Sequence, residues 1–198
     1  MRRKIIFIVI GVFLLVFFAS VVIFYLLGPT RGATFSSIVE IPSSEASFSL
    51  ISPDFANGEP IPARYTCDGE NIPPTLSWSD PPPGTKSLAL IVDDPDAPVG
   101  TWTHWIVYNI PPDVRTMDQS FTPGIQINDV KILFGKNSWG KQAYGGPCPP
   151  SGTHRYIFQF FALDILLGPK DRMTKNDLSA QMQNHILGFV QIMGTYTK

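Results

Sequence analysis

Two histidines and one aspartate are the side chains of this sequence whose types and spacing best suit ligand chemistry. His154 follows a loop rich in glycine and proline, residues 141–152, and stands where an apolar stretch begins. His104 lies inside an earlier apolar stretch, and Asp94 closes the one before it. An imidazole ring can donate hydrogen bonds and gain a proton when an anion arrives, so two of them suit phosphate. Stiff loops on a fixed scaffold are frequent places for such sites.

Hydrophobic periodicity predicts the strands that must position these side chains. Residues 86–94 and 101–110 are strand candidates close together in the chain, so we expect an antiparallel hairpin that places Asp94 near His104. A third strand is predicted from residue 155 onward, and the sequence does not decide whether it joins the same sheet. At a period of two, one face of the second strand should carry Trp102, His104, Ile106, Tyr108 and Ile110, and one face of the third His154, Tyr156, Phe158 and Phe160.

The rest of the chain predicts a mainly β domain. Shorter strands are expected at residues 48–52, 75–79 and 189–196, where apolar or β-branched residues are bounded by turn signals. Residues 111–140 are rich in such signals and predict loops. The sequence contains no internal repeat and no low-complexity tract.

One helix is predicted late in the sequence. Thr174 and Asp177 have the spacing of a capping box, in which each side chain accepts a backbone N–H of the other residue. Gly188 is a suitable helix terminator. Between them, residues recur at helical spacing: Leu178, Met182, His185 and Ile186.

Composition and charge exclude one class of partner. Hydrophobic residues make up 44% of the 198 residues and charged residues 16%, as in a globular or membrane-attached protein. Three of the fifteen bases precede the first apolar run, so the rest of the chain carries a net charge of about −4. A nucleic-acid-binding surface needs an excess of bases, and we expect no nucleic-acid partner.

The N-terminus predicts a membrane anchor. Residues 1–4 form a basic stub, and residues 5–27 are an uncharged apolar run that would span roughly 34 Å as a helix. Bases before the run favour a cytoplasmic N-terminus, with the following domain outside the cytoplasm at the cell membrane. A cleaved signal peptide is the alternative, in which case the domain would be secreted. The length of the run and the poor cleavage site after it favour the anchor.

A linker separates this anchor from the folded part. Residues 28–46 are rich in Ser, Thr, Gly and Pro and have no hydrophobic period. The domain should therefore extend over residues 47–198.

Three separated motifs of this domain resemble the phosphatidylethanolamine-binding proteins. The family includes the Raf kinase inhibitor proteins, and the chain is most similar to its bacterial and archaeal YbhB/YbcL-type branch. The motifs are DPDAP from Asp94, THW from Thr103 leading to Asn109-Ile110-Pro111, and GPCPPSGTHRY from Gly146. Residues 65–69 and Leu187-Gly188 also fit that branch.

The resemblance implies a fold and a site. The fold would be an antiparallel β-sandwich with a small anion pocket at one end. The pocket would be formed by Asp94, His104, His154 and Tyr156 and walled by a loop containing Cys148, Pro149 and Pro150. The implied ligand is phosphate or a phospho-headgroup, and neither an enzymatic reaction, a cofactor nor a metal is implied.

An aspartate beside a bound phosphate needs an explanation. Two like charges about 5 Å apart cost roughly 3 kcal/mol at an effective dielectric of 20. We therefore expect Asp94 either to accept the far ring N–H of a histidine or to receive a ligand ammonium group, as in ethanolamine.

The two cysteines predict a disulfide. Cys67 and Cys148 each lie in a loop of the motifs, and an exported domain would meet oxidising conditions, so we expect a Cys67–Cys148 bond.

Other functions remain open from the sequence. A hydrolase could use Ser151 or Cys148 as nucleophile with His154 as base, although no Gly-x-Ser-x-Gly elbow is present. A metal site on the histidines lacks the usual ligand spacing. The family also includes inhibitors of proteases or kinases, which act through surface loops and leave no local signature.

Overall fold

The computed structural model describes residues 48–170 and 172–198. The predicted stub (1–4), anchor (5–27) and linker (28–46) lie outside these residues. Where the chain is described, no helix has the length and apolar character that a membrane span requires.

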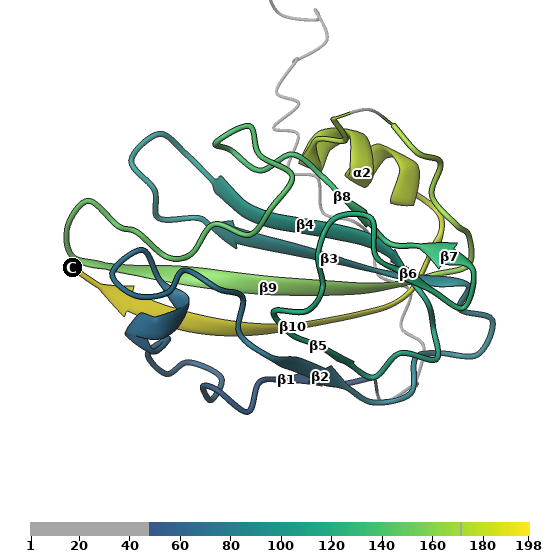
Figure 1. Cartoon of the computed structure of the whole chain (residues 1–198), viewed down its shortest axis with the longest axis horizontal. Helices are drawn as coiled ribbons and strands as arrows, with labels where there is room; N and C mark the ends of the chain where they lie inside the picture. Colours follow the sequence, from purple (N-terminus) through teal and green to yellow (C-terminus); the bar gives the residue numbers. More distant parts are fainter. Residues whose placement is uncertain (1–47, 171) are drawn as a thin grey trace, which may run out of the picture. The chain divides into compact units, whose positions relative to one another are not determined.

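The larger sheet holds the long apolar stretches of the sequence (Figure 1). Its strands are β3 (Ser87–Asp94), β4 (Trp102–Ile110), β8 (Leu133–Phe134), β9 (Thr153–Leu163) and β10 (Ile186–Thr197). They lie in the order β10-β9-β3-β4-β8, and every neighbouring pair is antiparallel. The predicted hairpin of β3 and β4 is confirmed, and β9 pairs with β3, which answers the question that the sequence left open.

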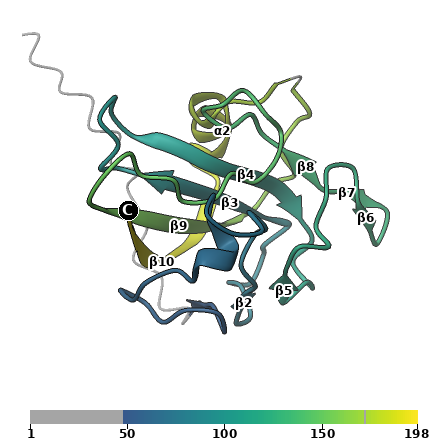
Figure 2. The same cartoon turned by 60° about the vertical axis from the view of Figure 1, so that its left-hand side comes forward.

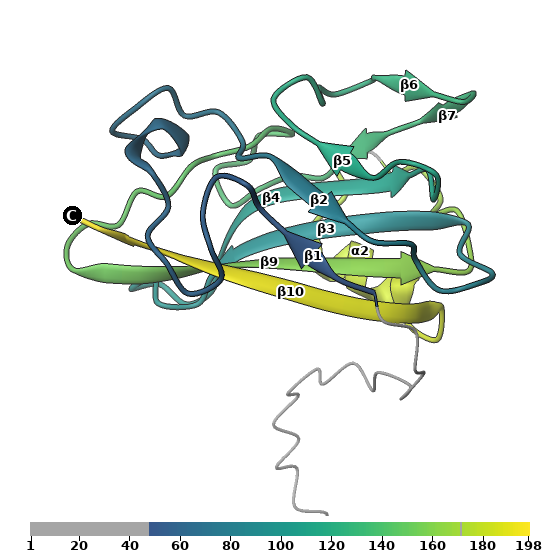
Figure 3. The ribbon, with the colours of Figure 1, turned by 90° about the horizontal axis from the view of Figure 1, so that it is seen from below.

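A smaller sheet covers one face of the larger one (Figure 3). Its strands, in spatial order, are β1 (Leu50–Ile51), β2 (Leu76–Trp78) and β5 (Thr116–Met117). Between the sheets lies an apolar core to which the two contribute Leu50, Leu76, Trp78, Met117, Leu88, Leu90, Val92, Phe158 and Phe160, among others. The mainly β sandwich is thus confirmed.

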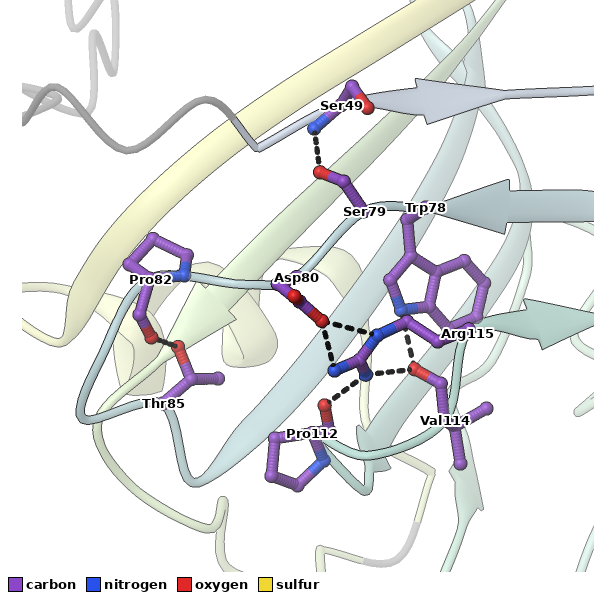
Figure 4. Close-up of polar contacts among 9 residues, drawn as sticks. All are labelled: Ser49, Trp78, Ser79, Asp80, Pro82, Thr85, Pro112, Val114 and Arg115. Carbon is purple, nitrogen blue, oxygen red and sulfur yellow. Dashed lines mark hydrogen bonds and ion pairs between the residues drawn. The ribbon is translucent and has the colours of Figure 1, made fainter.

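Polar contacts at one end of β2 and β5 fix the smaller sheet (Figure 4). The Trp78 indole N–H donates to the Val114 carbonyl at 2.8 Å. The Arg115 guanidinium donates to Asp80 Oδ1 through Nε at 2.9 Å and Nη2 at 2.6 Å. Because these strands are only two or three residues long, such contacts supplement a short ladder of backbone hydrogen bonds.

The other face of the larger sheet packs against α2 (Lys175–Met182) (Figure 2). Leu178 and Met182 enter a second apolar core with Ile91, Ile106 and Tyr108. Burying a side chain such as Leu178 stabilises the fold by roughly 1.5–3 kcal/mol.

The helix begins as predicted and ends earlier. Thr174 caps it, and the reciprocal bonds of the capping box with Asp177 are present. The expected continuation to Gly188 is wrong, because Asn184 adopts a left-handed backbone (φ 66°) and Ile186 already begins β10. His185 instead lies 2.8 Å from Asp164 through its Nδ1.

The predicted face of β4 is also wrong. Its register with β3 shifts twice, between Val92 and Asp93 and between Leu88 and Ala89. Ile110 therefore joins the core between the sheets, whereas Ile106 and Tyr108 join the core under the helix. Asn109, at the second shift, has a φ of 60°. Its side-chain N–H donates to the Leu167 carbonyl, and its Oδ1 accepts the Leu167 backbone N–H.

The turn-rich region 111–140 also contains a small separate hairpin. It consists of β6 (Gln126–Ile127) and β7 (Val130–Lys131). A single 3-10 turn, η1 (Ala63–Tyr65), precedes the loop that carries Cys67.

Candidate functional site

Two connections and one strand end lie together at one end of the larger sheet (Figure 1). They are the β3–β4 turn, the loop before β9, and the C-terminal end of β10. Asp94 is the last residue of β3, and His154 is the second of β9. Because the two strands are antiparallel neighbours, residues 60 positions apart meet here. His154 Nδ1 lies 2.7 Å from Asp94 Oδ2, and both residues are buried.

This pair fixes the orientation of both side chains. A carboxylate only accepts, so Nδ1 is the donor in this contact, and Nε2 is the ring nitrogen that the contact leaves unused. The other Asp94 oxygen, Oδ1, accepts the Asp96 backbone N–H at 2.8 Å. The His154–Asp94 contact thus agrees with the expectation that Asp94 accepts a histidine ring N–H.

His104 is fixed by a different acceptor. Its Nδ1 lies 2.7 Å from the Gly145 carbonyl oxygen, which can only accept, so Nδ1 is again the donor. Burial lowers the pKa of His104, although the Gly145 carbonyl and the charge of Asp94 oppose this effect. The ring is therefore neutral at neutral pH, with Nε2 unprotonated. The contacts of the two rings with Gly145 and Asp94 both use Nδ1.

Tyr156 contacts His104. Its ring meets the His104 ring edge to face, with centroids 5.1 Å apart. Its hydroxyl is buried and has no hydrogen-bond partner within the described part of the chain. Burial and the negative charge of Asp94 raise the pKa of Tyr156, so the hydroxyl stays protonated and can donate. We call Asp94, His104, His154 and Tyr156 the histidine site.

The loop that leads to His154 is anchored at several points. Asn137 accepts the backbone N–H groups of Trp139 and Lys141, and Asn71 accepts that of Gly146 at 2.7 Å. A Cβ at Gly145 would come within 2.5 Å of the Trp139 ring, and one at Gly146 within 2.4 Å of the Tyr65 carbonyl. Glycine is therefore required at both positions.

The predicted disulfide is confirmed. Cys67 and Cys148 are bonded, and they join the loop after η1 to the loop before β9 across 81 positions of sequence. Cys67 N–H also donates to the Pro147 carbonyl. No free thiol remains at Cys148, so the hydrolase with a Cys148 nucleophile is excluded in this state.

The remaining predicted residues lie around the site with less definite roles. Pro149 is buried, whereas Cys148 and Pro150 are exposed. Ser151 is exposed and forms no hydrogen bond with His154. The Arg155 guanidinium pairs with Asp96 at 2.6 Å. This arginine lowers the pKa of Asp96 to about 2.

Two tryptophans flank His104 and were not among the predicted site residues. The Trp139 ring lies edge to face on His104 (4.9 Å) and on Trp102 (5.4 Å). The Trp102 Nε1 is buried and has no partner among the described residues. The sequence Asn137-Ser138-Trp139-Gly140 predicted only a loop. The asparagine and the tryptophan in that loop were the sequence features that could have indicated a part of the site.

Two further features bear on other functions. In the ranges 48–170 and 172–198, no group of three or more His, Cys, Asp or Glu side chains could hold a metal ion. A surface cleft of about 390 Å³ lies elsewhere, lined by Tyr108, Lys131, Gln142 and Lys170 among others, and it shares no residue with the histidine site.

Comparison with known proteins identifies the family. The sequence profile described as phosphatidylethanolamine-binding protein matches residues 51–197. The chain belongs to the phosphatidylethanolamine-binding protein family.

Relatives in this family share most of the described domain. A UPF0098 protein of Methanothermobacter thermautotrophicus is 47% identical over 138 residues, which are 70% of this chain and 91% of the relative. One from Aquifex aeolicus is 44% identical over 77% of this chain and 90% of the relative.

Solved structures of family members agree with the fold. The phosphatidylethanolamine-binding protein homolog CT736 from Chlamydia trachomatis has a TM-score of 0.68 and 43% identity, covering 76% of this chain and 97% of its own. YbcL of E. coli, a member of the mammalian PEBP family, has a TM-score of 0.70 and 31% identity, covering 77% and 99%.

Proposed function

We propose that this protein binds a small anion, phosphate or a phospho-headgroup, at the histidine site and performs no chemical reaction on it. The observation that carries the proposal is the fixed orientation of two imidazole rings. Asp94 holds His154 and the Gly145 carbonyl holds His104, each through Nδ1, so that each Nε2 is left for a ligand. Membership of the phosphatidylethanolamine-binding protein family supports an anionic or phospholipid ligand.

The charges of the site are compatible with an anion. Asp94 is neutralised in part by His154 and by the Asp96 N–H, so its repulsion of a phosphate is reduced. A bound anion favours the protonated form of an adjacent imidazole, so each ring could donate a charge-assisted hydrogen bond from Nε2. The Tyr156 hydroxyl, a buried donor without a partner, could supply a third.

Neither of the two candidate nucleophiles, Ser151 and Cys148, is hydrogen-bonded to His154 among the described residues, which supports a binding protein. The Asp94–His154 pair could act as a general base, but Ser151 forms no hydrogen bond with His154, and Cys148 is held in a disulfide.

A phosphate titration followed by histidine NMR tests this function. Inorganic phosphate should shift the ring resonances of His104 and His154, and replacing either by alanine should weaken binding at least tenfold. His185 is the internal control, since it pairs with Asp164 away from the site, and its resonance should not move. No shift of His104 or His154 at millimolar phosphate would contradict the proposal.

We also propose that residues 5–27 anchor the protein in the cell membrane with the domain outside the cytoplasm. The uncharged run and the basic stub before it support this proposal. The full chain should stay with membranes after alkaline extraction, whereas a chain starting at residue 47 should be released. A full chain found processed near residue 30 would instead indicate a cleaved signal peptide.

A further inference from the structure

A buried carboxylate that the proposed function does not use lies next to Asp94 in the chain. Asp93 is 3% exposed, and its two oxygens accept hydrogen bonds from three other elements of the fold. Oδ1 accepts from the Thr103 hydroxyl of β4 at 2.8 Å, and Oδ2 accepts from Gln159 of β9 at 2.9 Å and from the Lys175 ammonium of α2 at 2.6 Å. Burying a carboxylate is costly unless it is paired and hydrogen-bonded, and these three donors meet both conditions.

The register of β3 and β4 changes at this carboxylate. Val92 pairs with Trp105. The next residue of β3, Asp93, pairs with Thr103, so β4 contributes one residue more than β3. The extra residue is His104, which makes this irregularity a β-bulge. Thr103 is thus the residue directly opposite Asp93, and the two side chains are bonded to each other.

The bulge decides which way the His104 ring faces. After it, the side chains of β4 alternate, because Trp105 joins the core between the sheets and Ile106 the core under the helix. Strict alternation would place His104 on the face of Ile106. Its ring instead lies edge to face on Tyr156, whose side chain belongs to the core between the sheets. Bulges commonly re-aim a side chain beside a functional site, and this one brings His104 into the histidine site.

We propose that Asp93 is a positioning residue of the histidine site, because its bond to Thr103 fixes the bulge and thereby the direction of the His104 ring. Ser138 holds the Thr103 backbone on the outer side of β4, where its hydroxyl accepts the Thr103 N–H at 2.8 Å and its own N–H donates to the Thr103 carbonyl at 2.9 Å. Asp93 ties the Thr103 side chain to β3 on the inner side. A slip of one residue would remove the bulge and turn His104 to the helix side, and the Asp93–Thr103 bond opposes this slip.

The consequence for ligand binding rests on the anion-binding function proposed above, whereas the direction of the His104 ring does not. The two can therefore be measured separately, the ring by NMR and the ligand by titration with inorganic phosphate.

Thr103→Val tests the bond in the full chain. Valine has the shape of threonine without the hydroxyl, and Asp93 keeps Gln159 and Lys175 as donors, so the variant should fold. The nuclear Overhauser contact between the His104 and Tyr156 rings should weaken relative to the unmodified chain. Inorganic phosphate should bind about fivefold more weakly, the factor that one hydrogen bond typically contributes. Thr103→Ser keeps the hydroxyl and should retain both the ring contact and the affinity.

Leu178→Ala is the control for a general loss of stability. Leu178 is fully buried in the core under α2, the helix whose Lys175 contacts Asp93. Its truncation should lower the free energy of unfolding at least as much as Thr103→Val does. The His104–Tyr156 contact should nevertheless stay unchanged, and phosphate affinity should stay within about twofold.

The outcomes distinguish this inference from the proposed function. An unchanged ring contact in Thr103→Val, a lost contact in Thr103→Ser, or an equal loss in Leu178→Ala would each overturn the positioning role of Asp93. If the contact weakens in Thr103→Val but the unmodified chain binds no phosphate, the positioning of His104 stands and the anion-binding function fails. If the contact weakens and phosphate affinity does not change, the direction of His104 has no bearing on the ligand, and the role of Asp93 in binding is overturned.

Discussion

The Asp94 carboxylate and the His154 ring, which belong to neighbouring strands of one sheet, meet at 2.7 Å in the buried end of that sheet. The contact sets which ring nitrogen of His154 carries the proton, and the same device recurs at His104 with a backbone carbonyl as acceptor. Both rings are thereby oriented before any ligand arrives, so binding need not order them.

Asp94→Asn tests this orientation. The amide can donate to the ring, which allows the other tautomer of His154, with the proton on Nε2. We expect phosphate affinity to fall about tenfold, as when the outer partner of a ligand-binding histidine is removed. Nitrogen-15 shifts of the His154 ring report the tautomer directly. Unchanged shifts would contradict the orienting role of Asp94. A rise in phosphate affinity would show that the charge repulsion by Asp94 outweighs that role.

His104 should make the stability of the ligand-free domain depend on pH. Burial lowers its folded-state pKa, so below about pH 6.5 the unfolded chain takes up a proton that the folded domain does not. The stability that the neutral His104 ring contributes is therefore present above that pH, and it is lost as pH falls toward the folded-state pKa of His104. Urea denaturation between pH 7.5 and 5 measures the slope. His104→Gln should flatten it, and an equal slope in this variant would contradict the assignment.

The disulfide should contribute strongly to stability. For a closed loop of about 80 residues, the chain-entropy model gives roughly 4–5 kcal/mol. Denaturation with and without reductant, and of the double variant Cys67→Ser with Cys148→Ser, measures this difference. An oxidised protein in which mass spectrometry detects two free thiols would refute the bond itself.

Gly145→Ala tests the loop that holds His104. The new Cβ would come within 2.5 Å of the Trp139 ring, so we expect a loss of roughly 1–3 kcal/mol in unfolding free energy and weaker phosphate binding. Gly168→Ala is the control, because the nearest atom to its Cβ, Gln181 Oε1, is 3.7 Å away. Its effect on stability should stay within about 0.5 kcal/mol. Equal stability in the two variants would contradict the close packing of Gly145.

The hairpin of β3 and β4 could be anticipated from strand periodicity and antiparallel pairing. The meeting of Asp94 with His154 could not, because the sequence left open whether β9 joins the same sheet. The face of His104 could not, because the register shifts between β3 and β4 leave no trace in the pattern of apolar residues. The helix was extended too far for a related reason: Ile186 continues the helical spacing of Leu178 and Met182 although it belongs to β10.

The contributions of the loops were the least predictable. The Gly145 carbonyl and the Trp139 ring are placed by backbone bonds to Asn137 and Asn71, and these depend on loop geometry that has no sequence period. The family resemblance supplied the candidate ligand-binding residues, and the loop contacts that support them are seen only in the structure.

The unequal size of the two sheets has a dynamic consequence. The ladders that join β1, β2 and β5 have two residue pairs each, whereas β9 pairs with β10 from Thr153 to Leu163 and with β3 from Ile157 to Leu163. Backbone amides of the small sheet should therefore exchange with deuterium through local opening, and those of β9 only when the whole domain unfolds. Since Asp94, His104 and His154 all lie on strands of the larger sheet, the histidine site should keep its arrangement while the smaller sheet opens locally.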